Sequence, residues 1–185
     1  MVRLNRIYTR TGDAGETGLV DGSRASKADP RFAAIGDVDE ANCALGVALR
    51  AVTGDEARAM LGRIQNELFD LGADLATPEG IEGALRIQPG QIARLEREID
   101  AMNEDLEPLR SFILPGGAGG SAELHLARAV VRRAERAAVA AAAGFNPDAL
   151  KYLNRLSDHI FVLGRWVARE QGGDILWQPG ATRDE

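Results

Sequence analysis

Hydrophobic side chains recur every three or four residues along most of the chain beyond residue 30, which is the spacing of one face of an α-helix. In the first of these stretches they stand at Ile35, Val38, Leu45, Leu49 and Val52. Interruptions of the pattern separate five predicted helices, at about residues 30–52, 55–76, 89–102, 121–143 and 148–170. We expect no strand, because no segment clearly alternates apolar and polar residues. The pattern therefore predicts an all-α protein, a five-helix bundle.

Residues that start and stop helices support these boundaries. Asp29 followed by Pro30 is typical of an N-cap and the first helical residue after it. We expect Asp55 and Ser121 to cap the second and fourth helices. The glycine and proline within residues 144–147 predict that the fourth helix ends before the fifth begins.

The length and composition fit one domain covering residues 1–185. Hydrophobic residues make up 45% of the chain and aromatic residues only 5%, which favours helices packed closely through Ala and Leu. Within this domain we distinguish a flexible Gly/Thr-rich N-terminal arm (1–29), a helical bundle (30–171) and a C-terminal tail (172–185).

Charge and cysteine content narrow the class of protein further. A formal charge of −6 argues against a broad nucleic-acid surface, although it leaves room for a small cationic pocket. The single cysteine, Cys43, cannot form an internal disulfide, and we expect a small buried side chain in a reducing compartment. No apolar run is long enough to span a membrane and the first residues do not resemble a signal peptide, so we expect a soluble cytoplasmic protein.

The arm contains a segment, residues 8–19, with three glycines, three threonines and one cation. Such a loop exposes backbone N–H groups and hydroxyls without bulky side chains, which suits a polyphosphate. It is not a Walker A motif, because no Gly-Lys-Ser/Thr follows the glycines, and no βαβ unit surrounds it as in a dinucleotide-binding fold. A surface arm rich in turn-forming residues is the alternative interpretation.

A second candidate lies on the predicted fourth helix. Arg128, Arg132 and Glu135 are spaced four and three residues apart and therefore share one face. Two guanidinium groups and a carboxylate could bind a triphosphate, or a phosphate with Mg²⁺. The alternative is a solvated face with ordinary ion pairs, which Arg133 and Arg136 would also join.

Other polar or aromatic residues leave two interpretations open. Asn154, Asp158 and Arg165 lie near one face of the fifth helix and form either a binding surface or an ordinary polar stripe. Asp39, beside the apolar stripe of the first helix, is either partly exposed or paired with a cation from elsewhere. Phe112 is either a core anchor or an apolar wall of a ligand site.

Several chemistries are not supported by the residues. His125 and His159 stand alone, so zinc and di-iron sites lack their ligand patterns, and we expect surface or hydrogen-bonded packing histidines. No nucleophilic triad is indicated.

Taken together, the candidate segments closely resemble one family, the PduO-type ATP:corrinoid adenosyltransferases. The matching segments follow one another in the family's order, at residues 8–15, 36–42, 112–117, 128–136 and 154–158. Two departures are Arg10, where many members have Lys, and Ala41, where Leu is common. Arg10 keeps the charge but changes the donor geometry.

The resemblance implies a five-helix homotrimer with ATP sites between subunits and the N-terminal arm folded over the nucleotide. The residues that match the ATP site are Thr9, Arg10, Thr11, Gly12, Thr17, Gly18, Lys27, Arg132, Arg133, Glu135, Arg136 and Asn154. Catalytic roles fall to Asp39 and Arg128, matched to an ion pair across the subunit boundary, and to Phe112, matched to the aromatic side chain that binds cobalamin and closes the lower face of the corrin.

The implied reaction transfers the 5′-deoxyadenosyl group of ATP to the cobalt of cob(I)alamin and releases triphosphate. ATP and cobalamin are substrates, Mg²⁺ binds through the phosphates with Glu135 as a candidate protein ligand, and K⁺ is a further candidate cation. An electron-donating reductase and an adenosylcobalamin-dependent enzyme are the expected partners. The alternative is a non-catalytic carrier or chaperone for nucleotide and corrinoid on the same bundle.

Overall fold

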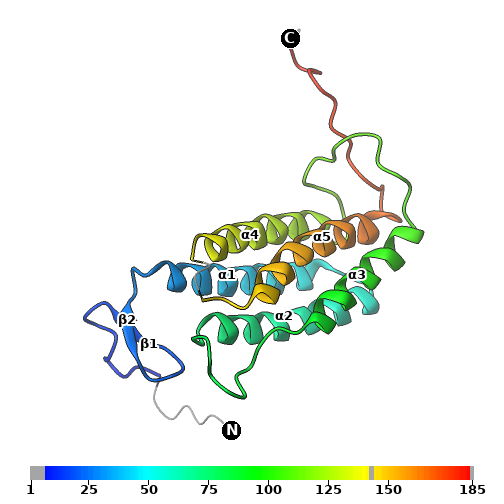
Figure 1. Ribbon diagram of the computed structural model, residues 1–185. Helices are drawn as coiled ribbons and strands as arrows, with labels where there is room; N and C mark the ends of the chain where they lie inside the picture. Colours follow the sequence, from blue (N-terminus) through cyan, green and yellow to red (C-terminus); the bar gives the residue numbers. More distant parts are fainter. Residues whose placement is uncertain (1–6, 142–143, 184–185) are drawn as a thin grey trace.

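The computed structural model describes residues 7–141 and 144–183 of the chain (Figure 1). The described residues form a two-stranded hairpin followed by five helices. These elements are β1 (Glu16–Gly18), β2 (Arg24–Ser26), α1 (Pro30–Ala51), α2 (Asp55–Leu75), α3 (Pro89–Glu104), α4 (Ser121–Ala140) and α5 (Pro147–Ala168). The predicted five-helix bundle is therefore confirmed.

The helices lie roughly side by side as one bundle (Figure 1). Helix α1 packs on α2 and α4, and α5 packs on α3 and α4, with a smaller contact to α2. Small residues of α1 and α4 allow a close approach, and those that are fully buried include Ala34, Ala41, Ala48, Ala127 and Ala134. Alanine-rich helix faces therefore form much of the core that the composition predicted.

The observed helix ends confirm one predicted cap and correct two. Asp29 accepts a hydrogen bond from the backbone N–H of Arg31 at 2.8 Å, as an N-cap should. The N-caps of α2 and α4 are Gly54 and Gly120, one residue before the predicted Asp55 and Ser121. The fifth helix begins one residue early, at Pro147, and ends at Ala168 rather than 170.

The prediction that the arm contains no strand is wrong. Residues of β1 and β2 pair antiparallel, with Thr17 opposite Ala25. Additional backbone hydrogen bonds from Leu19 N–H to the Ser23 carbonyl and from Lys27 N–H to the Gly15 carbonyl, both 2.8 Å, extend the pairing. Three-residue strands are too short to show alternation in the sequence, so the pattern could not reveal them.

The segment between α3 and α4 pairs with the C-terminal tail at the opposite end of the bundle from the hairpin (Figure 1). Leu114 N–H donates to the Ile175 carbonyl at 2.7 Å, and Trp177 N–H donates to the Phe112 carbonyl at 2.8 Å. We call residues 105–120 the connecting limb and residues 169–183 the tail limb. The paired limbs form a projection beyond the helices.

Candidate functional site

The outer faces of α4 and α5 bring four of the predicted ATP-site residues together. Asn154 on α5 donates a hydrogen bond of 2.8 Å to Glu135 on α4. Arg136 donates to the backbone carbonyl of Arg132 at 2.9 Å, and both arginines are exposed. This face therefore offers cations, an amide and a carboxylate to a ligand from outside the bundle.

Arg133 lies on the α1 side of α4 and is occupied within its own chain. Its guanidinium forms ion pairs with Asp37, at 3.2 Å, and with Glu40. Hydrogen bonding to Glu40 is the main cause of a raised pKa, and Asp37 adds to it. The structure thus separates Arg133 from Arg132, although the two are adjacent in sequence.

Arg128 is partly buried and lies against the ring of Phe161, with its guanidinium carbon 5.8 Å from the ring centroid. Among the described residues, none accepts a hydrogen bond from its buried Nε. Burial, and then the charge of Arg132, lower the pKa of Arg128. The guanidinium therefore lacks a carboxylate partner in the described part of this chain and would gain from one.

Asp39 stands exposed on α1 and is not paired with Arg128 in this chain. It lies at an apolar groove of about 500 Å³ between α1 and α2, whose walls include Phe32, Ile35 and Phe69. Phe69 is 72% exposed, which is unusual for a phenylalanine and indicates a surface that another molecule could cover.

The arm is organised by contacts between its own residues. The Thr9 and Thr11 hydroxyls lie 2.8 Å apart, and Arg24 donates to the Thr11 carbonyl at 2.7 Å. Lys27 donates to the Gly12 carbonyl at 2.9 Å, and a Cβ on Gly12 would lie 3.0 Å from the Lys27 Nζ. The glycine therefore allows the lysine ammonium to lie against the loop backbone.

Three further arm residues have specific backbone roles. Arg10 has a φ of 62°, a left-handed conformation that is uncommon outside glycine. Thr17 and Gly18 belong to β1, where Gly18 pairs with Arg24. The predicted loop therefore leads into a structured hairpin, with Thr9 and Thr11 on the exposed surface and Thr17 half-buried.

Phe112 is not a core residue, because its side chain is 77% exposed on the connecting limb. Its ring lies 6.1 Å from that of Trp177 on the tail limb, in a tilted arrangement of 55°. Ser111 also donates a hydrogen bond of 2.8 Å to the Trp177 carbonyl. An aromatic pair in this position is available to a flat, apolar ligand surface.

The arm and the connecting limb are separated by the length of the bundle within one chain. The arm leads into the first residue of α1, whereas the connecting limb ends at Gly120, where an added Cβ would lie 2.9 Å from the backbone nitrogen of Val52 beyond the last residue of α1. A helix of 22 residues is about 33 Å long. The structure therefore places the two predicted parts of the site at opposite ends (Figure 1).

Sequence reasoning missed the roles of Trp177 and Arg165 and misplaced Cys43. Arg165 joins the two limbs and is only 7% exposed, which an isolated arginine in a helical pattern does not reveal. Cys43 was expected to be buried but is exposed on α1. Of the two alternatives for the histidines, His159 is a hydrogen-bonded packing residue, since it is buried and bonded to Glu98 at 2.8 Å, and His125 is buried rather than on the surface.

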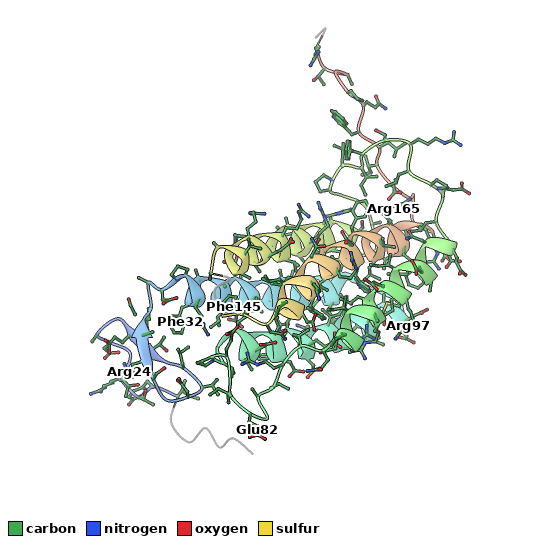
Figure 2. The ribbon with its side chains drawn as sticks, viewed as in Figure 1. Arg24, Phe32, Glu82, Arg97, Phe145 and Arg165 are labelled. Carbon is green, nitrogen blue, oxygen red and sulfur yellow. The ribbon has the colours of Figure 1, made fainter. Side chains whose placement is uncertain are left out.

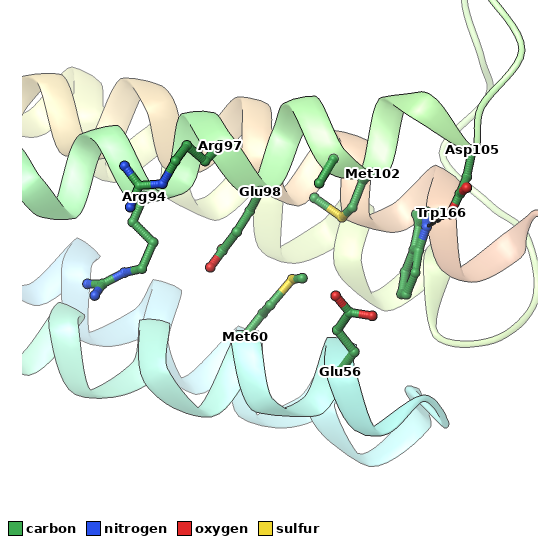
Figure 3. A pocket seen from close by; sticks show the side chains of 9 residues that line it. Glu56, Met60, Arg94, Arg97, Glu98, Met102, Asp105 and Trp166 are labelled. Carbon is green, nitrogen blue, oxygen red and sulfur yellow. Dashed lines mark hydrogen bonds between the residues drawn. The ribbon is translucent and has the colours of Figure 1, made fainter.

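A separate cavity of about 260 Å³ opens between α2 and α3 (Figure 3). In Figure 3, Glu56 and Met60 of α2 face Arg94, Glu98 and Met102 of α3, while Trp166 lies at one end. Charged groups in and beside the cavity form the ion pairs Arg63–Glu98 and Arg94–Glu67, and Tyr152 donates a hydrogen bond to Glu67. Among the described residues, the buried Nε atoms of Arg63 and Arg94 have no hydrogen-bond partner. Since their carboxylate partners are already supplied by α2 and α3, we interpret the cavity as a polar seam between these helices.

The described part of the chain shows neither a cluster of metal-binding side chains nor a membrane-spanning helix. Among those residues, no group of three or more His, Cys, Asp or Glu side chains is placed to hold a metal ion. A single carboxylate such as Glu135 fits Mg²⁺ only when the ligand's phosphates supply the other oxygen atoms, which is the usual arrangement for magnesium nucleotides. No described helix is long and apolar enough to cross a membrane.

These features define a class of protein first. A helical bundle carries exposed cations on one helix pair, a hydroxyl-rich hairpin at one end and an exposed aromatic pair at the other. The class is a bundle equipped to bind a polyanion and an apolar ring system.

Comparison with known proteins identifies the family. The sequence model of cobalamin adenosyltransferases matches residues 7–167. The corrinoid adenosyltransferase of Mycobacterium tuberculosis is 52% identical over 190 residues, which cover 98% of this chain and 97% of that protein. The human corrinoid adenosyltransferase MMAB is 42% identical over 179 residues, covering 92% of this chain and 72% of the human protein.

Solved structures agree with this result. A variant of the PduO-type ATP:corrinoid adenosyltransferase from Lactobacillus reuteri, complexed with cobalamin and ATP, superposes with a TM-score of 0.88 at 36% identity, covering 94% of this chain and 99% of that one. Another variant of that protein, complexed with ATP, gives a TM-score of 0.86 at 37% identity, covering 94% of this chain and 100% of that one. The chain belongs to the cobalamin adenosyltransferase family, whose members are alkyl-transferring enzymes.

Proposed function

We propose that this chain transfers the 5′-deoxyadenosyl group of ATP to the cobalt of a reduced corrinoid. Cob(I)alamin supplies an electron pair that forms the Co–C5′ bond, while the C5′–O bond breaks and its electron pair leaves with triphosphate. The observation that carries the proposal is the α4–α5 face, where Glu135 and Asn154 meet beside Arg132, in a chain of this family.

The absence of a catalytic base from the proposed mechanism follows from the chemistry. Co(I) is itself the nucleophile, so the protein has only to bind, align and stabilise charge. Alignment of two reactants can lower the barrier by about 7 kcal/mol or more. Arg132, Arg136 and Lys27 would stabilise the charge that develops on the leaving triphosphate, since positioned cations act most strongly where charge appears in the transition state.

Mg²⁺ would be held by the phosphate oxygens with Glu135 as its protein ligand, and it would neutralise part of the phosphate charge. Asn154 fixes the carboxylate through the hydrogen bond to its Oε1. We assign no residues to K⁺.

Phe112 would act on the corrinoid before adenosyl transfer. An apolar ring beneath the corrin would exclude water and the lower nucleotide base, leaving four-coordinate cob(II)alamin. Loss of an axial donor makes Co(II) easier to reduce, because the donor favours the higher oxidation state. The exposed position of Phe112 beside Trp177 supports this role, since neither ring is buried in the protein core.

A homotrimer would bring the separated parts of the site together. The arm and Phe112 lie at opposite ends of a helix about 33 Å long, so a site that uses both must draw them from different chains. The unpartnered Nε of Arg128 and the exposed carboxylate of Asp39 fit an ion pair between subunits. The apolar groove beside Asp39 would be covered in the same interface.

The proposal is tested by anaerobic incubation of the protein with cob(I)alamin and Mg-ATP. We expect the visible spectrum of adenosylcobalamin and one triphosphate released per product. Arg132→Ala should slow turnover and weaken ATP binding, whereas Arg97→Ala, an exposed cation of α3, should leave both unchanged. Binding of ATP and corrinoid without formation of a Co–C bond would instead indicate a carrier.

A further inference from the structure

One buried guanidinium of the bundle contacts both limbs that carry Phe112 and Trp177. Arg165 lies on the last turn of α5 and is 7% exposed, and Figure 2 shows it at the end of the bundle where the limbs begin. Its Nε donates to Asp174 of the tail limb, and its Nη2 donates to the Glu107 carbonyl of the connecting limb, each at 2.8 Å. One side chain therefore links both limbs, and the neighbouring Trp166 adds a hydrogen bond of 3.0 Å to Asp105 of the connecting limb.

The geometry of this contact requires an arginine. The guanidinium is planar and rigid, so donors on different edges bind acceptors at a fixed separation and angle. A lysine ammonium could pair with Asp174, but it would not hold the Glu107 carbonyl in the same geometry. Asp174 is itself largely buried, with 19% of its side chain exposed, so loss of the guanidinium would leave its charge uncompensated.

The positions of the limbs determine where the two exposed rings stand. Beyond Arg165 the limbs are connected through backbone hydrogen bonds between Leu114 and Ile175 and between Trp177 and Phe112. A cavity of about 380 Å³ lies beneath them, bounded in part by Arg165, Asp174 and Leu176. Phe112 is 77% exposed and Trp177 is 45% exposed, so the core holds these rings only weakly, and the polar contacts of Arg165 contribute to their position.

We infer that Arg165 is a positioning residue for the corrinoid half of the reaction. It holds the connecting and tail limbs in register, so that Phe112 and Trp177 form one aromatic surface for the lower face of the corrin. This inference rests on the proposed adenosyl transfer to a corrinoid. It assigns Arg165 no contact with ATP, since its partners are Asp174 and the Glu107 carbonyl.

The first test compares Arg165→Gln and Arg165→Lys with the control Arg169→Gln. Arg169 lies one turn further along the chain, where it pairs with the exposed Glu170 and contacts Trp166. With Mg-ATP and cob(II)alamin bound, we expect Arg165→Gln to lower the fraction of cob(II)alamin that is four-coordinate by about fivefold. The KM for corrinoid should rise about tenfold, whereas the KM for ATP should change less than about twofold. Arg165→Lys should likewise raise the KM for corrinoid but not that for ATP, and Arg169→Gln should behave as wild type.

A folded Arg165→Gln variant with the wild-type four-coordinate fraction and corrinoid KM would overturn the inference. An equal rise of both KM values would also overturn it, because that is the result of general destabilisation. If Arg165→Gln does not fold, Asp174→Asn removes the charge of the same contact from the partly exposed partner, and the same rise in the KM for corrinoid but not in that for ATP is expected.

A second measurement does not depend on turnover. The chain has two tryptophans, so Trp166→Phe leaves Trp177 as the single fluorescent indole. Because this change also removes the hydrogen bond of 3.0 Å from Trp166 to Asp105, emission is compared only between proteins that carry it. In this background we expect Arg165→Gln to shift the Trp177 emission to longer wavelength, because the ring leaves Phe112 for water. An unchanged emission would contradict the inference. If the wild-type protein formed no adenosylcobalamin, the proposed function would fail, and this measurement would still decide whether Arg165 positions the limbs.

Discussion

At the scale of single residues, Phe112 on the connecting limb and His125 on α4 differ sharply in how much of the side chain is exposed. Phe112 leaves its ring 77% exposed, although exposure of so much apolar surface is unfavourable. His125 is only 3% exposed, and among the described residues none is hydrogen-bonded to its buried Nδ1. The first arrangement fits a surface that a ligand covers, and the second affects how stability depends on pH.

Phe112→Ala should separate activity from stability. The free energy of unfolding should change by less than about 0.5 kcal/mol because the ring makes little contact with the core. Turnover that starts from cob(II)alamin should fall at least about tenfold, which corresponds to about 1.4 kcal/mol in the barrier. Parallel assays of turnover and thermal unfolding check this, with the exposed Leu85→Ala as a control. Wild-type turnover in Phe112→Ala would refute the role of the ring.

His125 should make the protein less stable in mild acid. Burial, and then the charge of Arg128, lower its pKa from the usual 6.5, while Asp174 opposes the shift. The unfolded chain therefore binds a proton that the folded chain does not, and stability is lost as the pH falls below about 6.5.

Urea unfolding of His125→Leu at a series of pH values should show a smaller loss of stability below this pH than wild type. His159→Gln removes the only other histidine and shows how much of the slope belongs to that imidazole. A slope in His125→Leu equal to that of wild type would contradict this assignment.

At the scale of elements, one carboxylate joins the end of α2 to the start of α5. Asp74 is 1% exposed and accepts hydrogen bonds from Arg86 at 2.7 Å, and from Ile87 N–H and Asn146 at 2.8 Å each. Asn146 is also the N-cap of α5, because it accepts from Asp148 N–H. The carboxylate thus holds a loop and a helix start against α2.

Asp74→Ala should therefore be strongly destabilising. Removal of one partner from a buried ion pair costs about 3–5 kcal/mol, because the other charge is left uncompensated. Denaturant unfolding should show this loss, whereas Asp100→Ala, at an exposed position of α3, should change little. A loss below about 1 kcal/mol in Asp74→Ala would show that Arg86 finds another partner.

The sequence predicted the elements well where local patterns determine them. The stripe from Ile35 to Val52 and the cap at Asp29 depend only on nearby residues, and both were identified. The cap at Gly120 was missed because its cause is tertiary. Gly120 has a φ of 89°, and an added Cβ would lie 2.6 Å from Val52, a residue of another segment.

The same distinction applies to the candidate site. Helix periodicity placed Glu135 and Asn154 on faces of two different helices, and only the family resemblance assigned both to one site, where the structure shows them hydrogen-bonded. The separation of Arg133 from Arg132 was not predictable, because it depends on where Asp37 and Glu40 of α1 lie. Nor could a pattern show that Arg165 joins two limbs that are 67 residues apart, at Glu107 and Asp174.

At the scale of the whole molecule, the two ends of the bundle carry different parts of the proposed site. The hairpin lies where α1 begins, and the paired limbs lie where α1 ends (Figure 1). Arg24 on the hairpin and Arg165 below the limbs mark these ends in Figure 2. If ATP binds between the subunits of a homotrimer, a complete site would combine the arm of one subunit with the α4 face of another.

Mixed trimers should test this division. Lys27→Ala damages the arm and Arg132→Ala damages the α4 face, so each variant alone should be poorly active. If each site uses both parts from different chains, equal random mixing after unfolding and refolding should restore about one quarter of the wild-type rate. The control is a mixture of Arg132→Ala with Asn154→Ala, both on one face, which should gain nothing. Failure of the first mixture to gain activity would show that one chain supplies both parts.

The placement of hairpin and limbs at opposite ends of a single chain would also make the proposed reaction sensitive to dilution. An isolated subunit would hold two half-sites too far apart to cooperate, however well each was folded. Specific activity should consequently decline once the protein concentration falls below that needed for association, and saturating substrates would restore it only by drawing subunits back together.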